Sequence, residues 1–152
     1  MKLALKVPPP VQALIFGILM WFVDKRVPVG QFDFSLGLPV AISIAGAGFA
    51  LAILANLEFR RVSTTVDPIH PEKASQLVVS GVFQYSRNPM YVGLTLVLIG
   101  WAIWLGSASN LALLILFVAY ITHFQIKPEE EVLKTLFGEA YEQYCSNVRR
   151  WI

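Results

Sequence analysis

The residues best suited to chemistry lie in two short polar segments that border apolar stretches of the chain. The first segment, SRNPMYVG at residues 86–93, places Arg87, Asn88 and Pro89 directly before an apolar run. A residue that precedes proline is biased towards an extended backbone, so the segment enters the run as a shaped loop. Free N–H groups at the helix N-terminus that follows, together with a guanidinium, suit a carboxylate or another anion.

Tyr91, one turn into the same apolar run, has two open interpretations. It can be an aromatic residue of the kind enriched at membrane interfaces, or a hydroxyl and an aromatic face beside the anion site. Arg87 has a similar alternative, because an arginine at the edge of a membrane span can extend its side chain to lipid phosphates. Both residues are candidates for the site.

The second polar segment is the acidic triplet Glu129, Glu130 and Glu131. Acidic residues at a helix N-terminus complement the helix dipole, so part of the triplet has a purely structural interpretation. A hairpin of the two preceding apolar stretches would return the triplet to the side of residues 86–93. An arginine and an amide opposite carboxylates would then form a clamp for a zwitterion.

Histidine and cysteine add little chemistry. His123 is a candidate proton shuttle, although a satisfied polar residue is the more common interpretation, and His70 lies in the loop segment PIHP. Cys145 is the single cysteine, so the chain has neither an internal disulfide nor a cysteine cluster for zinc. The glycines of the segment GAG at 46–48 indicate close helix packing, because no strand precedes them as in a dinucleotide-binding loop.

The composition indicates a membrane protein. Of the 152 residues, 56% are hydrophobic and 14% are charged, whereas soluble domains are nearer half apolar and a quarter charged. The formal net charge of +2, without a lysine- and arginine-rich run, argues against a nucleic-acid partner. The length predicts a single domain over residues 1–152.

Four apolar stretches predict an all-α, polytopic membrane protein with about four transmembrane helices. They cover residues 11–23, 36–57, 90–105 and 111–124. As a helix, the second is about 33 Å long, enough to cross a hydrocarbon core of about 30 Å. The linker GSASN joins the last two stretches into an antiparallel hairpin. The first stretch has a basic start like a signal peptide but no small-residue cleavage site, so we expect it to be retained.

The basic residues predict the orientation of the four spans. If both termini lie on one side, ten lysines and arginines fall on that side and only Lys25 and Arg26 on the other. The ten are Lys2, Lys6, Arg60, Arg61, Lys73, Arg87, Lys127, Lys134, Arg149 and Arg150. Because cytoplasmic loops carry an excess of lysine and arginine, both termini and the site are predicted to be cytoplasmic.

Two predicted cytoplasmic segments follow the first two spans, which lie within residues 1–57. The loop at 58–89 is long for a small protein, and long loops are commonly functional or disordered. The hairpin at 90–124 is followed by residues 128–152, whose apolar residues recur at three- and four-residue steps. We expect an amphipathic helix there, at the membrane surface or against the loop, with Trp151 as an interfacial anchor.

Two motifs carry a resemblance to a known family. LVVSGVFQYSRNPMYVG at 77–93 and EEEVLKTLFGEAYEQYCSNVRRW at 129–151 flank the predicted hairpin. In this order the chain resembles the isoprenylcysteine carboxyl methyltransferase family, which is related to the membrane phospholipid N-methyltransferases. The resemblance covers roughly residues 75–152, and the first two spans carry no diagnostic residues.

The resemblance implies an integral membrane methyltransferase that uses S-adenosylmethionine, bound in a cytoplasm-facing pocket. The implied cofactor-binding residues are Ser75, Gln76, Leu77, Val78, Phe83, Asn88, Pro89, Met90, Tyr91 and Glu129. The candidate catalytic residues are Arg87, Glu130 and His123, and no metal is implied. The expected partners are membrane lipids and a lipophilic or lipid acceptor that carries a carboxylate, an amine or a thiol.

Two positions depart from the family pattern. Asn88 stands where the family usually has histidine, so the position keeps its hydrogen bonding but not a proton-transfer group. Gln125 stands where prenylcysteine enzymes carry a substrate-binding arginine, which argues against a prenylcysteine carboxylate acceptor. Two other functions stay open: a membrane NADPH-dependent lipid or sterol reductase, because some reductases share a similar C-terminal hairpin, and a small non-enzymatic membrane protein.

Overall fold

The fold is a bundle of long helices. The computed structural model describes residues 7–27, 29–32, 37–62, 72 and 74–152. The elements are α1 (Pro9–Arg26), α2 (Gly37–Arg61), the 3-10 turn η2 (Gly81–Gln84), α3 (Pro89–Leu105), α4 (Ser109–Ile121), the π-helical turn η3 (Thr122–Ile126) and α5 (Lys127–Asn147). Within these ranges the only β-type pairing is an isolated bridge between Gln31 and Ser107, so the predicted all-α class is confirmed.

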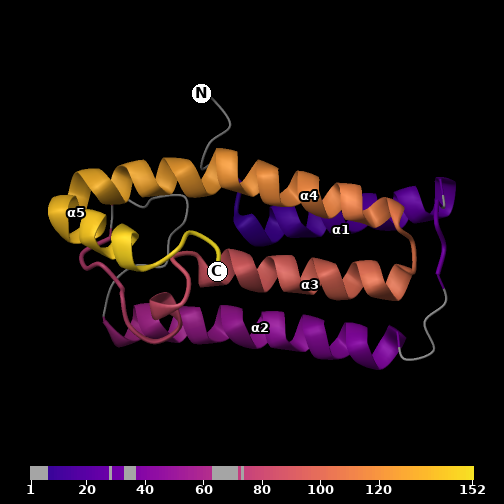
Figure 1. The fold of residues 1–152 in the computed structure, drawn as a ribbon, viewed down its shortest axis with the longest axis horizontal. Coiled ribbons are helices and arrows are strands. Elements are labelled where there is room, and N and C mark those ends of the chain that lie inside the picture. The colour runs from indigo at the N-terminus through magenta and orange to yellow at the C-terminus, as the bar shows by residue number, and fades with distance from the viewer. Residues whose placement is uncertain (1–6, 28, 33–36, 63–71, 73) are drawn as a thin grey trace.

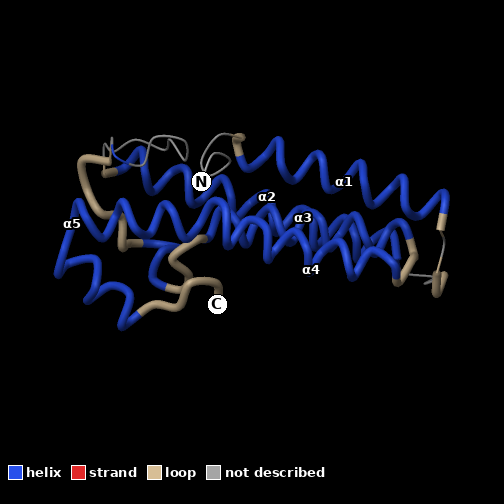
Figure 2. Tube along the Cα trace, turned by 90° about the horizontal axis from the view of Figure 1, so that it is seen from above, coloured by secondary structure: helices blue, strands red, loops and turns tan. Residues whose placement is uncertain are grey.

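Helices α1 to α4 run lengthwise beside one another (Figure 1). The predicted hairpin is present as α3 and α4, and α3 packs most extensively against α2, whereas α1 packs on α3 and α4. Figure 2 shows α1 displaced to one side of the other three helices. The α3–α4 turn lies at one end of the bundle, and α5 and the described residues before α3 lie at the other (Figure 1).

Local sequence explains where α3 begins and ends. Asn88 has a non-helical backbone (φ −131°, ψ 52°) and Pro89 occupies the first turn of the helix, where a missing N–H costs least. The helix stops at Gly106, whose positive φ of 69° forms a left-handed cap and whose N–H donates to the Ala102 carbonyl at 3.1 Å. The helix therefore begins one residue before the predicted span at 90–105 and ends at the same residue as that span.

Two glycines that face each other across the helix interface let α2 and α3 approach closely. A Cβ atom added at Gly93 would lie 2.5 Å from the Gly48 carbonyl oxygen, and one added at Gly48 would lie 2.5 Å from the Gly93 carbonyl oxygen. Small residues allow this backbone approach between membrane helices. The predicted packing role of the segment GAG is thus confirmed for Gly48, whereas a Cβ at Gly46 would meet nothing within 4 Å.

The fourth stretch and the C-terminal helix are continuous, which corrects the predicted break between them. The π-helical turn η3 joins α4 to α5. The helix expected over 128–152 corresponds to α5, which is shorter than expected and is not straight. Gly138 (φ 49°, ψ −125°) kinks α5, and α5 ends at Asn147. Leu136, before the kink, is 44% exposed, whereas Tyr141, beyond it, is buried.

The bundle exposes apolar side chains on its outer surface. Leu14, Ile42, Phe49 and Ile115 are each more than 60% exposed, and soluble monomers rarely present large contiguous apolar patches. By length and composition, two helices of the described residues can cross a membrane: α2 and the continuous helix Ser109–Asn147. The apolar part of the latter ends at Ile126, because Lys127, Pro128 and the acidic triplet follow.

Candidate active site

A cavity of about 410 Å³ lies at the end of the bundle that carries α5. Its walls come from the start of α1, the last turns of α2, the segment before α3, the start of α3, and α5. The lining residues are Pro8, Pro9, Pro10, Ala52, Asn56, Phe59, Ala74, Gln76, Leu77, Val78, Phe83, Arg87, Asn88, Pro89, Met90, Tyr91, Leu94, Glu129, Glu130, Leu133, Tyr141 and Tyr144. The volume is within the range of about 300–1,000 Å³ typical of small-molecule sites.

A chain of hydrogen bonds links α3, α5 and α1 at one wall of the cavity. The Tyr91 hydroxyl donates to Glu129 Oε1 at 2.5 Å, and Gln125 Nε2 donates to the same oxygen at 2.8 Å. Gln12 Nε2 donates to Gln125 Oε1 at 3.3 Å. The side chain of Gln125 is fully buried. These contacts hold the Glu129 carboxyl group at a fixed place in the lining.

The environment of Glu129 changes its acidity. Glu129 follows the last apolar turn of its helix and lies outside the apolar segments. Burial raises the pKa of its carboxyl from 4.5 to about 7, although the hydrogen bonds from Tyr91 and Gln125 act in the opposite direction. The carboxyl is therefore poised to change its protonation state near neutral pH.

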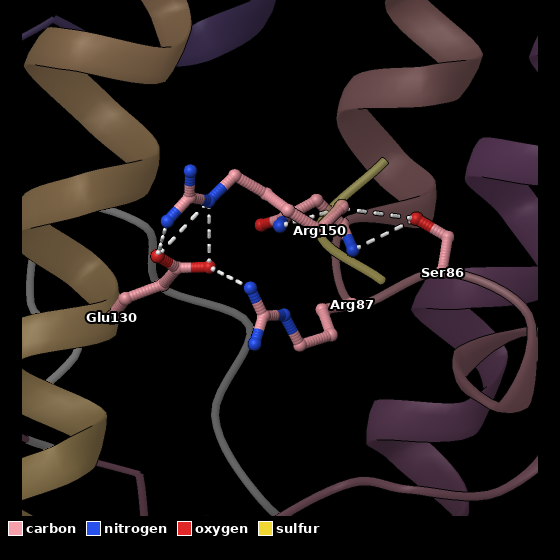
Figure 3. Close-up of polar contacts among 5 residues, drawn as sticks. Ser86, Arg87, Glu130 and Arg150 are labelled. Atoms are coloured by element: carbon pink, nitrogen blue, oxygen red, sulfur yellow. Dashed lines mark hydrogen bonds and ion pairs between the residues drawn. The ribbon is translucent and has the colours of Figure 1, made fainter. Parts of the chain in front are cut away.

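A second carboxylate, Glu130, is shared by two arginines (Figure 3). Arg87 Nη2 lies 3.0 Å from Glu130 Oε1, and Arg150 Nη2 lies 2.7 Å from Oε2. Arg150 Nε also donates to both oxygens, at 3.0 and 3.1 Å. The hydrogen bonds to Glu130 raise the pKa of Arg150. The group combines two positive charges and one negative charge.

The polar segment before α3 is held by the C-terminal residues. The Arg87 N–H donates to the Arg149 carbonyl at 3.0 Å, and Asn88 Nδ2 donates to the Arg150 carbonyl at 3.0 Å. Ser86 Oγ donates to the same carbonyl at 3.4 Å and accepts the Asn88 N–H at 3.1 Å. The loop shape predicted from the Asn-Pro pair is therefore fixed by residues more than 60 positions later in the chain.

An aromatic group closes another wall. The ring centroids of Phe59 and Phe83 lie 5.2 Å apart in an edge-to-face arrangement, and the Tyr144 hydroxyl donates to the Phe83 carbonyl at 2.6 Å. Phe83 is buried in the short turn η2. Tyr144 thus ties the end of α5 to the segment that carries Phe83.

The structure brings most of the sequence-predicted residues together. The predicted meeting of the two polar segments is confirmed by the contacts of Tyr91 with Glu129 and of Arg87 with Glu130. The predicted residues that line the cavity are Gln76, Leu77, Val78, Phe83, Arg87, Asn88, Pro89, Met90, Tyr91, Glu129 and Glu130.

Two predicted residues lie away from the cavity lining. Ser75 is exposed. His123 is also exposed, with its ring 4.7 Å from that of Phe124. Another four residues used in the sequence analysis, His70, Lys2, Lys6 and Lys73, lie outside the described ranges.

Several cavity residues were missed because they lie in the first two helices. Asn56 and the prolines at 8–10 contribute to the lining, although no diagnostic residue was expected there. A polar residue within a long apolar stretch is a signal of function in membrane proteins, and Asn56 fits it. Arg150, which binds Glu130 from outside the lining, was predicted only as one of the positive charges on the cytoplasmic side. Trp151 is half-buried and packs against the bundle core.

The sequence of the chain is similar to parts of two longer proteins. Over 72 residues the chain is 35% identical to a protein-S-isoprenylcysteine O-methyltransferase of Schizosaccharomyces pombe, covering 47% of this chain and 30% of that protein. Over 156 aligned residues it is 26% identical to a Delta(14)-sterol reductase of Mus musculus, covering 89% of this chain and 36% of that protein. The chain thus spans about a third of the length of these two relatives.

A shorter relative and a family-level match complete the comparison. A protein of Haemophilus influenzae described only as uncharacterized is 41% identical over 63 residues, which is its entire length and 41% of this chain. No solved structure matches the chain. The family model described as phospholipid methyltransferase matches residues 36–140, well over half of the chain, so the chain belongs to the phospholipid methyltransferase family.

Proposed function

We propose that the protein is an integral membrane methyltransferase that uses S-adenosylmethionine to methylate a lipophilic or membrane-associated acceptor. The observation that carries this proposal is the single cavity wall shared by the two sequence motifs, where Tyr91 contacts Glu129 and Arg87 contacts Glu130. Family membership supports methyl transfer, and residues 1–152 are proposed to act as one domain.

The lining fits the chemistry of this cofactor. S-adenosylmethionine carries an ammonium, a carboxylate, an adenine ring and a sulfonium. In the proposed assignment Glu129 receives the ammonium and Arg87 the carboxylate, as charge-assisted contacts. Phe83 and Tyr91 offer aromatic faces, which favour both flat rings and cations. Gln76, Leu77, Val78, Asn88, Pro89 and Met90 complete the proposed cofactor site.

The residues act mainly by positioning. When bound, the cofactor supplies an electrophilic methyl group for in-line transfer to a nucleophilic acceptor. The chain holds the reacting groups in line and excludes water, and such positioning lowers the barrier strongly. A carboxylate acceptor needs no base, whereas an amine or thiol has to lose a proton. Of the candidate bases, Glu129 and Glu130 line the cavity, whereas His123 is exposed and does not.

The acceptor is proposed to be a lipid or another lipophilic molecule. The family description names phospholipids, and the relative in Schizosaccharomyces pombe is named for an isoprenylcysteine substrate. Part of the lining is apolar and comes from bundle helices, including Ala52, Leu94 and Pro9. An acceptor with an apolar chain can be accommodated on this side of the cavity.

We propose four membrane spans, with both termini and the site cytoplasmic. The described lysines and arginines support this orientation. Lys25 and Arg26 lie at the far end of α1, whereas the elements and connecting segments at the end with the cavity carry Arg60, Arg61, Arg87, Lys127, Lys134, Arg149 and Arg150. Helices α1 and α3, with 18 and 17 residues, approach the length that a span requires.

Ligand binding tests the proposal. Purified protein in detergent is expected to bind S-adenosylmethionine or S-adenosylhomocysteine in isothermal titration calorimetry, and Glu129→Ala should abolish the heat because it removes the proposed ammonium contact. Glu139→Ala is a matched control, since Glu139 is exposed on the same helix and does not line the cavity. Absence of heat with either ligand for the wild-type protein would reject the proposal.

One alternative has a specific observation in its favour. The match to a sterol reductase extends over 89% of this chain, and a reductase would bind a nicotinamide cofactor in the same cavity. Calorimetry with NADPH, run beside the methyl donor, separates the two functions. Heat with NADPH alone would establish the reductase, and no heat with any of these ligands would favour a non-enzymatic protein.

A further inference from the structure

Arg150 contacts the cavity wall without being part of it. Its guanidinium binds Glu130, which lines the cavity together with Arg87, whereas Arg150 is absent from the lining residues. Its carbonyl accepts hydrogen bonds from Ser86 and Asn88. The inference that follows rests on the proposed cofactor and concerns how this outer residue acts on the site.

The two arginines make unequal contacts with the Glu130 carboxylate. Arg150 directs both Nε and Nη2 to the Glu130 carboxylate, with distances of 2.7 to 3.1 Å, whereas Arg87 reaches it through Nη2 alone. A carboxylate engaged in this way by one guanidinium has less capacity for a second. The buried Nε of Arg87 accordingly has no hydrogen-bond partner among the described residues.

The net charge of this group of side chains also favours an anionic ligand. Two guanidiniums and one carboxylate leave one net positive charge beside the cavity, whereas Arg87 and Glu130 alone would be neutral. An anionic group of a ligand would therefore find a charge and an unused donor on Arg87. Arg150 supplies the second of these positive charges from outside the cavity.

We propose that Arg150 is a positioning residue: by occupying Glu130, it keeps the Arg87 guanidinium available for the carboxylate of the cofactor. Without Arg150, Glu130 would take Arg87 as its sole partner and compete with the ligand for it. The effect should appear only for ligands that carry the carboxylate. A residue that merely fastened the C-terminal segment would affect all ligands alike.

The test compares two ligands on the full chain in detergent. Calorimetry measures the Kd of S-adenosylhomocysteine and of its decarboxylated analogue for wild-type protein, Arg150→Met and Arg149→Met. Methionine retains the backbone carbonyl that Ser86 and Asn88 use. Arg150→Met should raise the Kd of S-adenosylhomocysteine by roughly tenfold, the size expected for the loss of about one charge-assisted contact. The Kd of the decarboxylated analogue should not change. Arg149→Met, a change in an exposed neighbour, should alter neither.

A double variant tests whether Arg150 acts through Glu130. Residues that act as one unit show non-additive effects, so Arg150→Met combined with Glu130→Gln should bind S-adenosylhomocysteine no more weakly than Glu130→Gln alone. Equal weakening of both ligands by Arg150→Met, no weakening, or additive effects would each overturn the positioning role. Wild-type protein that binds neither ligand would instead overturn the proposed function, and this inference with it. Far-UV circular dichroism identifies a misfolded variant, in which case Arg150→Gln, which also removes the charge and carries the same expected results, replaces Arg150→Met.

Discussion

At the scale of single residues, the site depends on two adjacent glutamates in different environments. Glu129 accepts hydrogen bonds from a hydroxyl and an amide, and burial raises its pKa to about 7. Glu130 is instead paired with two arginines, Arg87 and Arg150. Their neighbouring positions in the sequence therefore do not make them equivalent, and Glu129 is expected to titrate near neutral pH.

Cofactor affinity should rise with pH because of Glu129. Below a pH of about 7 the free carboxyl is largely protonated and offers no charge to an ammonium, whereas above it the carboxylate is present. We expect the Kd of S-adenosylhomocysteine to fall several-fold between about pH 6 and pH 7.5. Calorimetry across this range is the measurement. Glu129→Gln should bind more weakly and without this pH dependence, and a wild-type Kd that stays constant would contradict the assignment.

Asn110 is a residue whose replacement should stabilise the fold. Its side chain is fully buried, and neither its amide oxygen nor its nitrogen has a hydrogen-bond partner among the described residues. A buried polar group without a partner costs about 1–3 kcal/mol, which an apolar side chain of similar size avoids. Asn110→Leu should therefore raise the melting temperature in detergent, followed by circular dichroism. Gln125→Leu, which removes a hydrogen bond to Glu129, should lower it.

At the scale of the elements, the contact between α2 and α3 depends on the absence of side chains. The backbones approach so closely at Gly48 and Gly93 that a Cβ at either would lie 2.5 Å from the opposing carbonyl. Since α3 also carries Met90, Tyr91 and Leu94 of the cavity, the spacing of these two helices sets the width of the site.

Gly93→Ala should separate α2 from α3. The added methyl group has no room beside the Gly48 carbonyl, and overpacking of this kind costs about 1–3 kcal/mol. A lower melting temperature and a weaker cofactor affinity are expected. Gly46→Ala is the matched control, because its Cβ would meet nothing within 4 Å and alanine favours a helix over glycine by about 1 kcal/mol. Equal behaviour of the two variants would contradict this packing role.

At the scale of the whole molecule, the two ends of the bundle differ in character. One end carries the cavity, α5 and seven of the described lysines and arginines, and the other carries the α3–α4 turn near Gln31. By the positive-inside rule, this distribution supports the proposed cytoplasmic location of the cavity end. This assignment follows from charge distribution and predicts which surface residues are accessible from outside a cell.

Cysteine labelling in intact cells tests this orientation. In a Cys145→Ala background, Gln31→Cys should react with a membrane-impermeant maleimide, whereas Gln143→Cys should react only after the membrane is permeabilised. Both positions are exposed in the structure and lie at opposite ends of the bundle. Labelling of Gln143→Cys in intact cells would reverse the orientation and place the site outside the cytoplasm.

The sequence by itself determined the helical class, the hairpin and the motifs of the site. Apolar runs and the Asn-Pro pair act over a few residues, so α3 begins and ends where its local sequence predicts. The meeting of Tyr91 with Glu129 was also accessible, because a hairpin has to return its two ends to the same side.

The tertiary structure decided what depends on distant segments. The contribution of Asn56 and of the prolines at 8–10 to the cavity requires the packing of α1 and α2 around the start of α3. The proposed role of Arg150 depends on a segment that follows the kink at Gly138 and returns to Ser86 and Asn88. Contacts across more than 60 residues leave no local periodic signal, because they arise only when the chain closes on itself.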